Sequence, residues 1–270
     1  MRPAVTCVCL AFVGVGAAAA RSSDRAVAAR AQQQLGKALD AAKATPAQRV
    51  SLAVAVNQLV ASTELAFGVP ATAEIDTILT LFEHDTIDGT AVAAIKRRRS
   101  AGYDLVAAAL VQAFNRFHDT LSPEQRQRLI DHVRKRVEGR RLRKLKQGFL
   151  ELVVAAQVED LLERAGASEP ERATVRVARD EVLAAFRAPQ AALTTFLDRV
   201  AALFRADAVD QAELGKVREE KLKEVLTIVD TLERALVQIH DGLTPEHRQR
   251  LVELVRARRA HRVPAHVDEL

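Results

Sequence analysis

Apolar residues recur at intervals of three and four along most of this chain, which is the spacing that places them on one face of an α-helix. The prolines fall between these periodic stretches, where helices begin or end. The longest apolar stripe consists of Val92, Ile95, Tyr103, Val106, Leu110, Phe114 and Phe117. The pattern predicts helices over 25–43, 46–67, 71–83, 88–119, 123–146, 149–165, 170–187, 189–206, 210–240 and 245–262.

Three of the predicted helices begin with the same capping motif. In Ser122-Pro123-Glu124-Gln125, the serine oxygen accepts from a free backbone N–H, proline takes the first helical position, and glutamine bonds back to the serine N–H. Thr45-Pro46-Ala47-Gln48 repeats the motif, and Thr244-Pro245-Glu246-His247 keeps all of it except the last residue. A single copy of this motif indicates only where a helix starts.

The second half of the chain repeats the first. Residues 81–129 align without a gap on residues 203–251, at an offset of 122 positions, and nine of the last twelve aligned positions are identical. Every member of the long apolar stripe has an apolar counterpart at this offset. The chain is therefore a tandem duplication, and we place its two helical units at 21–147 and 148–270.

The composition agrees with a helical protein. Apolar residues make up 49% of the 270 residues and aromatic residues only 4%, while 11 glycines and 8 prolines are too few for a sandwich of short strands. These values favour an all-α fold. The formal net charge is +5, from 40 lysines and arginines against 35 acidic residues, so an acidic partner is favoured over a basic one.

The N-terminus has the pattern of a targeting segment. After Arg2, the stretch 4–20 is apolar, uncharged and ends in small residues. This pattern predicts a cleavable secretory signal peptide over 1–20, with a retained membrane anchor as the alternative. Because both cysteines, Cys7 and Cys9, lie inside this segment, the exported chain would contain no disulfide.

Each unit shows the same order of features: an acidic turn of the form Leu-Phe-x-x-Asp-x-x-Asp, a long helix, and then a capping motif preceded by leucine. The turns begin at Leu81 and Leu203. The motif residues after the long helices are Leu121, Ser122, Pro123, Gln125, Leu243, Thr244, Pro245 and His247. In this order of features the chain resembles the LTxxQ proteins of the Spy/CpxP family, over nearly all of both units. The first motif copy of each unit is degenerate, with Ala44 where the family has leucine.

The resemblance implies a fold, a location and a function. Members of that family are small periplasmic chaperones that work without ATP, or regulators of envelope stress, and their long antiparallel helices dimerise into a cradle. By this resemblance we expect two tandem Spy-like units that form a pseudo-dimer in one chain, either as a monomer or as a homodimer. The implied partners are unfolded or misfolded envelope proteins, with a membrane stress sensor as a second kind of partner.

The candidate client-binding residues are cations that lie beside apolar positions. Such charges attract acidic segments from a distance, and apolar neighbours then bury exposed client surface. The candidates are Arg99, Lys221, Arg126, Arg128, Arg134, Lys135, Arg136, Arg248, Arg250, Arg256, Arg258 and Arg259. A solvated helix face is the alternative interpretation of the charge run. For Arg99 and Lys221, which interrupt the apolar stripes, the alternative is a side chain that lies along the edge of the stripe.

We expect neither an enzyme nor a nucleic-acid-binding protein. Common phosphate-binding, nucleophile and zinc-protease motifs do not occur in the sequence, and the basic run has no interleaved aromatic residues. For the chaperone we expect no cofactor. The alternative function is the binding or sensing of a heavy metal, with a Zn, Cu or Ni ion held by His84, Asp85, His261 and His266.

Overall fold

The computed structural model describes residues 24–67, 71–141 and 145–260. These residues form helices with short connections and include no strand, which confirms the all-α fold. The expected signal peptide, 1–20, lies outside the described residues. The helices are α2 (Asp24–Ala41), α3 (Pro46–Phe67), α4 (Ala71–Glu83), α5 (Gly89–Thr120), α6 (Pro123–Arg141), α7 (Leu145–Ala165), α8 (Glu169–Ala191), α9 (Leu193–Arg205), α10 (Gln211–Gly242) and α11 (Pro245–Ala260).

The predicted order of helices is confirmed, and the larger differences in helix ends lie at two junctions. The sequence predicts a helix start at Pro189, but α8 continues through this proline and α9 begins at Leu193. Pro189 lacks the N–H that would bond to the carbonyl oxygen four residues earlier, and the helix is interrupted just after it, between Ala191 and Leu193. The second difference lies at the junction of α6 and α7, where α6 is described up to Arg141 and α7 begins at Leu145, before its predicted start at 149.

The two long helices, α5 and α10, begin in the same way. Asp88 and Asp210 are the N-cap residues, and their carboxylates accept hydrogen bonds from backbone N–H groups of the first turn. They are the second aspartates of the two acidic turns, so the repeated turn is in fact a helix start. Each of the two helices then runs for 32 residues.

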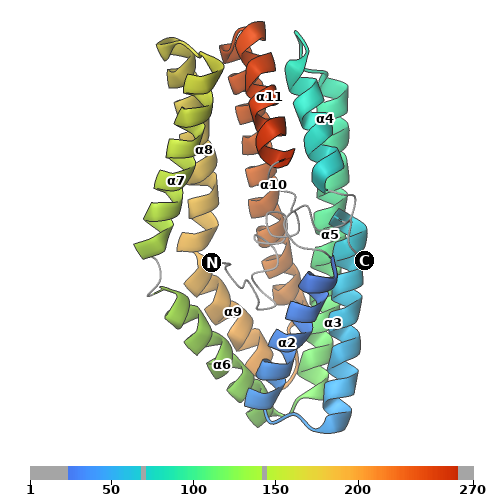
Figure 1. The fold of residues 1–270 in the computed structure, drawn as a ribbon. Helices are drawn as coiled ribbons and strands as arrows, with labels where there is room; N and C mark the ends of the chain where they lie inside the picture. The colour runs from blue at the N-terminus through green and yellow to red at the C-terminus, as the bar shows by residue number, and fades with distance from the viewer. Residues whose placement is uncertain (1–23, 68–70, 142–144, 261–270) are drawn as a thin grey trace, which may run out of the picture.

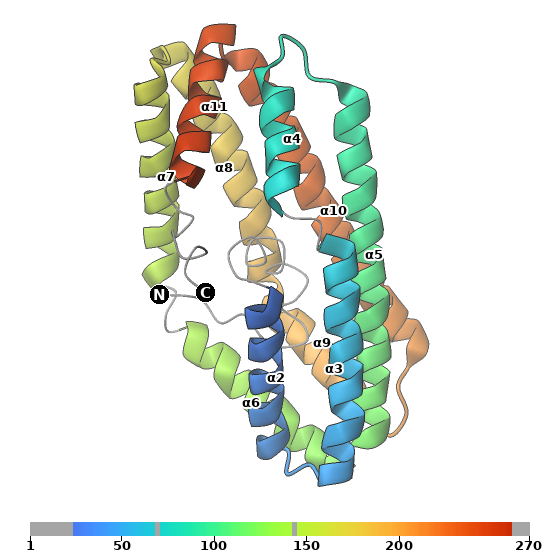
Figure 2. The ribbon, with the colours of Figure 1, turned by 45° about the vertical axis from the view of Figure 1, so that its right-hand side comes forward.

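α5 and α10 lie antiparallel along an elongated molecule (Figure 1). Asn115, near the end of α5, bonds to Gln211 at the start of α10, with 3.3 Å between Nδ2 and Oε1. Lys96, near the start of α5, lies 2.8 Å from the carboxylate of Asp230 in the second half of α10. Figure 2 shows the partner of each long helix: α3 packs along α5, and α8 packs along α10.

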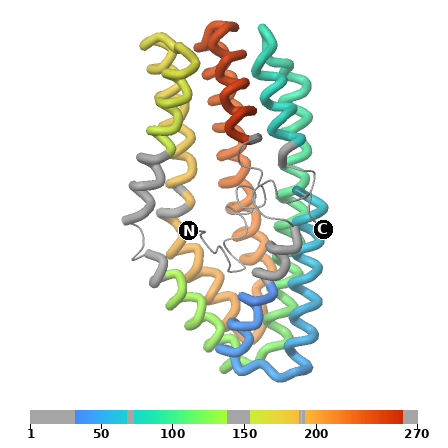
Figure 3. Tube along the Cα trace, in the orientation of Figure 1, coloured from blue at the N-terminus to red at the C-terminus, as the bar shows by residue number. Residues whose placement is uncertain are grey.

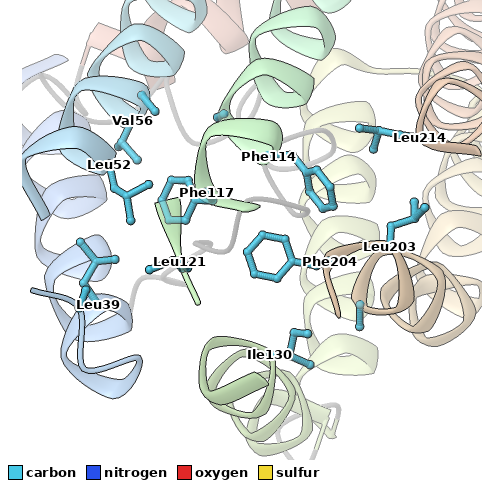
Figure 4. Close-up of a cluster of buried hydrophobic side chains, with 14 of the residues drawn as sticks. Leu39, Leu52, Val56, Phe114, Phe117, Leu121, Ile130, Leu203, Phe204 and Leu214 are labelled. Carbon is cyan, nitrogen blue, oxygen red and sulfur yellow. The ribbon is translucent and has the colours of Figure 1, made fainter. Parts of the chain in front are cut away.

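Figure 3 shows α2, α3, α6 and α9 toward one end of the molecule and α4, α7 and α11 toward the other. Each end has its own apolar core, and each core combines helices from both units. The first end core joins α2, α3, α5 and α6 to Leu203 and Phe204 of α9 and to Leu214 at the start of α10 (Figure 4). The second end core joins α7, α8, α10 and α11 to Phe82 of α4. The phenylalanine of each acidic turn is therefore buried against the helices of the other unit.

We call this packing of α4 and α9 against the opposite unit the exchange of helices. Two buried histidines stabilise it. The Nε2 atom of His118 lies 2.8 Å from the carbonyl oxygen of Ala206, and that of His240 lies 2.9 Å from the carbonyl oxygen of His84. The same offset of 122 positions relates both members of the two contacts. The repeat in the sequence is thus also a repeat of contacts between the units.

Candidate binding surface and the motif loops

One side of α3 presents apolar side chains to solvent. Val50, Val54 and Leu65 are 68%, 53% and 78% exposed, and Ala61 is exposed between them. Their spacing of four, seven and four residues places all of them on one face of the helix, which we call the α3 face, with the exposed polar residues Asn57 and Gln58 between Val54 and Ala61. Large apolar residues gathered on one exposed face are typical of an interaction surface.

The opposite side of α3 holds the helix to the molecule, since Leu52, Ala55 and Val56 are buried. Within the described ranges α3 is the one helix long and apolar enough to cross a membrane by composition, and most of this apolar sequence is not buried. The sequence analysis missed the α3 face because α3 is apolar on nearly all sides, and its pattern does not show which side packs. The low number of charged residues in α3 could have indicated an exposed apolar side, because only Arg49 and Glu64 are ionisable in this helix.

A cation lies beside the N-terminal part of the α3 face. Arg116 of α5 is exposed, and its Nε donates a hydrogen bond to Ser51 Oγ at 3.0 Å. Nearby, Arg49 forms an ion pair with Asp40 at 2.6 Å, so its charge is already compensated within the chain. Arg116 therefore places a positive charge next to exposed apolar side chains, which is the combination that the sequence predicted for other helices.

Two of the expected client-binding cations are buried. Arg126 and Arg248 are each only 5% exposed. Arg126 donates hydrogen bonds to the carbonyl oxygens of His118, Leu121 and Ala206, and Arg248 donates to the equivalent carbonyls of His240 and Leu243. The last carbonyls of a helix lack partners inside the helix, and these guanidinium groups supply them. Arg126 and Arg248 therefore bind the free carbonyl oxygens at the C-terminal ends of α5 and α10. The prediction that these two arginines bind clients at the surface is wrong.

Arg99 and Lys221 are held by partners in the same chain. Arg99 forms an ion pair with the buried carboxylate of Glu74 at 2.6 Å and lies over the ring of Phe67. Lys221 lies 4.5 Å from the ring centre of Phe196, and its Nζ contacts Glu224 at 2.7 Å. Positions 74 and 196 are equivalent in the repeat. These contacts favour the alternative interpretation, in which both side chains lie along the edge of the apolar stripe.

The other expected cations divide into two groups. Arg134 pairs with Asp198 of α9 at 2.7 Å, while Arg256 and Arg259 pair with Glu83 and Asp76 of α4, each at 2.5 Å. These three arginines therefore connect α6 and α11 to the exchanged helices of the other unit. The second group is exposed or half-buried and consists of Arg128, Lys135, Arg136, Arg250 and Arg258.

The two capping motifs of the first unit bind each other. The predicted capping box at Ser122 is confirmed, since its N–H donates to Gln125 Oε1 at 3.0 Å and its Oγ accepts from the Gln125 N–H. The side-chain amides of Gln48 and Gln125 also bond to each other, at 2.8 and 3.0 Å. We call this pair of glutamines the first clasp, because it joins the start of α3 to the start of α6.

The equivalent contact of the second unit is ionisable. Here Glu171 at the start of α8 replaces Gln48, and His247 at the start of α11 replaces Gln125. His247 Nδ1 lies 2.8 and 3.0 Å from the two carboxylate oxygens of Glu171. We call this pair the second clasp. The degenerate first motif of this unit, Ser168-Glu169-Pro170-Glu171, is therefore still a working capping motif, with glutamate in place of glutamine.

Hydrogen bonds set the charge state of Glu171. Its carboxylate accepts from the Ser168 hydroxyl at 2.6 Å, the Ser168 N–H at 2.7 Å and the Thr244 N–H at 2.9 Å. Burial by itself raises the pKa of Glu171, but the hydrogen bonds from His247, Ser168 and Thr244 outweigh this effect and lower the pKa to about 2. Glu171 is therefore an anion at neutral pH.

The expected metal ligands are only partly described. His84 and Asp85 lie exposed between α4 and α5, with Asp85 3.6 Å from the guanidinium of Arg248. His261 and His266 lie outside the described residues. In the part of the chain that the structure describes, no group of three or more His, Cys, Asp or Glu side chains is arranged to hold a metal ion.

We find no protein family, curated protein or solved structure that matches this chain. Its function has to be inferred from its own residues and contacts.

Proposed function

We propose that this protein is an exported, ATP-independent chaperone-like protein that binds unfolded or misfolded envelope proteins in the periplasm and limits their aggregation. The observation that carries the proposal is the α3 face, where Val50, Val54 and Leu65 are exposed on one side of a packed helix. Unfolded proteins expose apolar segments, and burying these segments against such a face is favourable. Binding of this kind requires neither a nucleotide nor a cofactor.

The small size of the α3 face suits a chaperone that releases its clients without ATP. Apolar burial contributes roughly 25 cal/mol for each Å² removed from water. The few side chains of the α3 face therefore give weak binding, and a client that folds and hides its own apolar residues dissociates. A much larger apolar surface would hold clients too tightly for release in the absence of an energy source.

Exposed cations support the capture of acidic client segments. Arg116 lies next to the α3 face, and Arg128, Lys135 and Arg250 are exposed on α6 and α11. Such charges increase the rate of encounter with acidic chains, and this effect weakens as salt concentration rises. The net charge of +5 acts in the same direction.

The exchange of helices between the units supports a pseudo-dimer within one chain. Each end core needs a helix from the other unit, as the subunits of an interlocked dimer need each other. A monomer therefore suffices for the complete fold, and a homodimer of the whole chain is the second arrangement. A membrane stress sensor as a partner, and metal binding through His84, Asp85, His261 and His266, stay predictions from the sequence.

The proposal is tested by light scattering from an aggregating client protein mixed with the chain lacking residues 1–20. We expect near-stoichiometric suppression of aggregation that weakens as salt rises. Replacing Val54 and Leu65 together by serine should raise the amount of protein needed several-fold, because it removes apolar surface from the α3 face without touching the core.

A matched control variant is Val177→Ser. Val177 is the residue of the second unit equivalent to Val54 and is also about half exposed, but acidic residues follow it at 180 and 181, one helical turn away. We expect this variant to suppress aggregation as well as the unmodified chain. If the unmodified chain suppresses no aggregation, or if the two variants behave alike, the α3 face is not the binding surface.

A further inference from the structure

The two clasps are equivalent in position but differ in chemistry. The first clasp is a pair of neutral amides, Gln48 and Gln125, while the second is a carboxylate and an imidazole, Glu171 and His247. Each clasp ties the N-terminus of one helix to the N-terminus of another and closes one end of the molecule.

The backbone contacts around the two clasps are the same, but the acidic groups differ, since Asp40 pairs with Arg49 and Glu124 accepts from Ser122 beside the first clasp. Arg49 donates to the carbonyl oxygen of Ala44 beside the first clasp, and Arg172 donates to that of Ala167 beside the second. The guanidinium groups of Arg126 and Arg248 also occupy equivalent places, on the carbonyl oxygens that precede α6 and α11. Exchanging the clasp residues between the two ends therefore separates their effect from that of the neighbouring acidic groups.

Glu171 is the centre of the second clasp. Its side chain is buried, and it receives four hydrogen bonds: one from His247, two from Ser168 and one from the Thr244 N–H. A protonated carboxyl group has only one oxygen left that accepts strongly, and it carries no charge to strengthen the bond from the imidazole. The four donors then compete for fewer acceptor sites, and the contact between α8 and α11 weakens.

The charged groups on the helices around the second clasp already have partners. Arg172 bonds to the Ala167 carbonyl, and Arg248 bonds to the Leu243 carbonyl and lies near Asp85. Glu169 pairs with Arg176, and the ring of His240 contacts Asp241 and the His84 carbonyl. Glu246 is exposed. Among these groups Glu171 is the anion that binds His247, and an arginine directly follows each member of the clasp in the sequence, Arg172 after Glu171 and Arg248 after His247.

We propose that the second clasp is an acid-sensitive latch, which opens when Glu171 is protonated and exposes the second end core while the first end core stays closed. The apolar residues behind the latch are Leu162, Ala167, Val175, Leu243 and Val252. The opening is a property of the fold itself and does not depend on the proposed function.

The sign of the effect follows from the pKa of Glu171. The pKa is about 2 in the folded protein and 4.5 for a glutamate in water. A carboxyl group with a lowered pKa stabilises the folded state above the higher value, and this stabilisation is lost as the pH falls toward the lower one. The latch therefore weakens between about pH 4.5 and pH 2, and the first clasp, which has no ionisable group, does not.

The test is amide hydrogen exchange of the chain lacking residues 1–20, followed in peptides from each end core. At each pH, peptides from the two end cores and from each variant are compared with one another, so the effect of pH on the intrinsic exchange rate is common to all of them. On going from pH 6 to pH 3, we expect peptides containing Leu162 and Val252 to lose at least tenfold more protection than peptides containing Leu52 and Ile130.

Two double variants exchange the clasps. Glu171→Gln with His247→Gln copies the first clasp into the second unit, and should remove the difference between the two ends at pH 3. Gln48→Glu with Gln125→His should transfer acid sensitivity to the first end core. Equal loss of protection at both ends of the unmodified chain would overturn the proposal. So would an unchanged difference after Glu171 and His247 are both replaced by glutamine.

Discussion

At the scale of single residues, the same residue type has opposite roles at neighbouring positions. Arg126 is buried and bonds to three carbonyl oxygens, whereas Arg128, two positions later, is exposed. In the sequence both belong to one basic run. An arginine is seldom buried unless it is paired, and helix ends offer unpaired carbonyls for this purpose. The two terminal nitrogens of Arg126 use such carbonyls, while its buried Nε has no partner.

This contrast predicts a difference in stability. Arg126→Ala leaves buried carbonyl oxygens without donors, and should lower the free energy of unfolding by roughly 1 to 3 kcal/mol. Arg128→Ala should change it by less than about 0.5 kcal/mol, as is usual for exposed positions. Urea unfolding followed by circular dichroism measures both. Equal midpoints for the two variants would contradict the structural role of Arg126.

At the scale of helix pairs, the equivalent contacts of the two units pack residues of different sizes. Gly242 at the end of α10 lies against Thr174 of α8. The first unit has Thr120 in place of Gly242, and Ser51 in place of Thr174 when α3 and α8 are aligned on Arg49 and Arg172. A larger residue on one helix thus accompanies a smaller one on the other.

A methyl group at Gly242 would have no room, because its Cβ would lie 2.6 Å from Thr174 Cγ2. We expect Gly242→Ala to destabilise the protein by roughly 1 to 3 kcal/mol through overpacking. Adding Thr174→Ser, which copies the first unit, should restore most of the loss. Chemical denaturation of the single and double variants measures this coupling. Additive effects of the two substitutions would mean that the two side chains do not interact.

At the scale of the whole molecule, the units of the sequence are not units of folding. Leu203 and Phe204 of the second unit complete the first end core, and Phe82 of the first unit lies in the second end core. Ion pairs follow the same exchange, since Arg134 binds Asp198 and Arg256 binds Glu83. Neither end core is complete without the other half of the chain.

Cutting the chain between α6 and α7 tests this arrangement. We expect fragments 21–141 and 145–270, expressed separately, to lack cooperative thermal unfolding, because each lacks part of the core around its own long helix. Expressed together, they should form a one-to-one complex that unfolds cooperatively. Size-exclusion chromatography with circular dichroism detects both outcomes. A separate fragment that is monomeric and unfolds cooperatively would show that the exchange is not required.

Much of the fold can be predicted from local patterns in the sequence. The capping motif at Ser122 and the aspartates at 88 and 210 mark helix starts, because caps act on backbone groups a few residues away. The apolar stripe of α5 includes Val106, Leu110 and Phe114, all of them buried. The duplication is equally plain, since it is a property of the sequence alone.

The sequence by itself determined the helices, their order, the repeat and the position of the motif loops. Only the tertiary structure decided that α4 and α9 cross to the opposite unit, that Arg126 and Arg248 turn inward, that the α3 face is exposed, and that Glu171 meets His247. The physical reason is the distance along the chain over which each kind of interaction acts. Periodicity and caps depend on neighbours within two turns, whereas burial and pairing depend on residues that are distant in the chain and close in space.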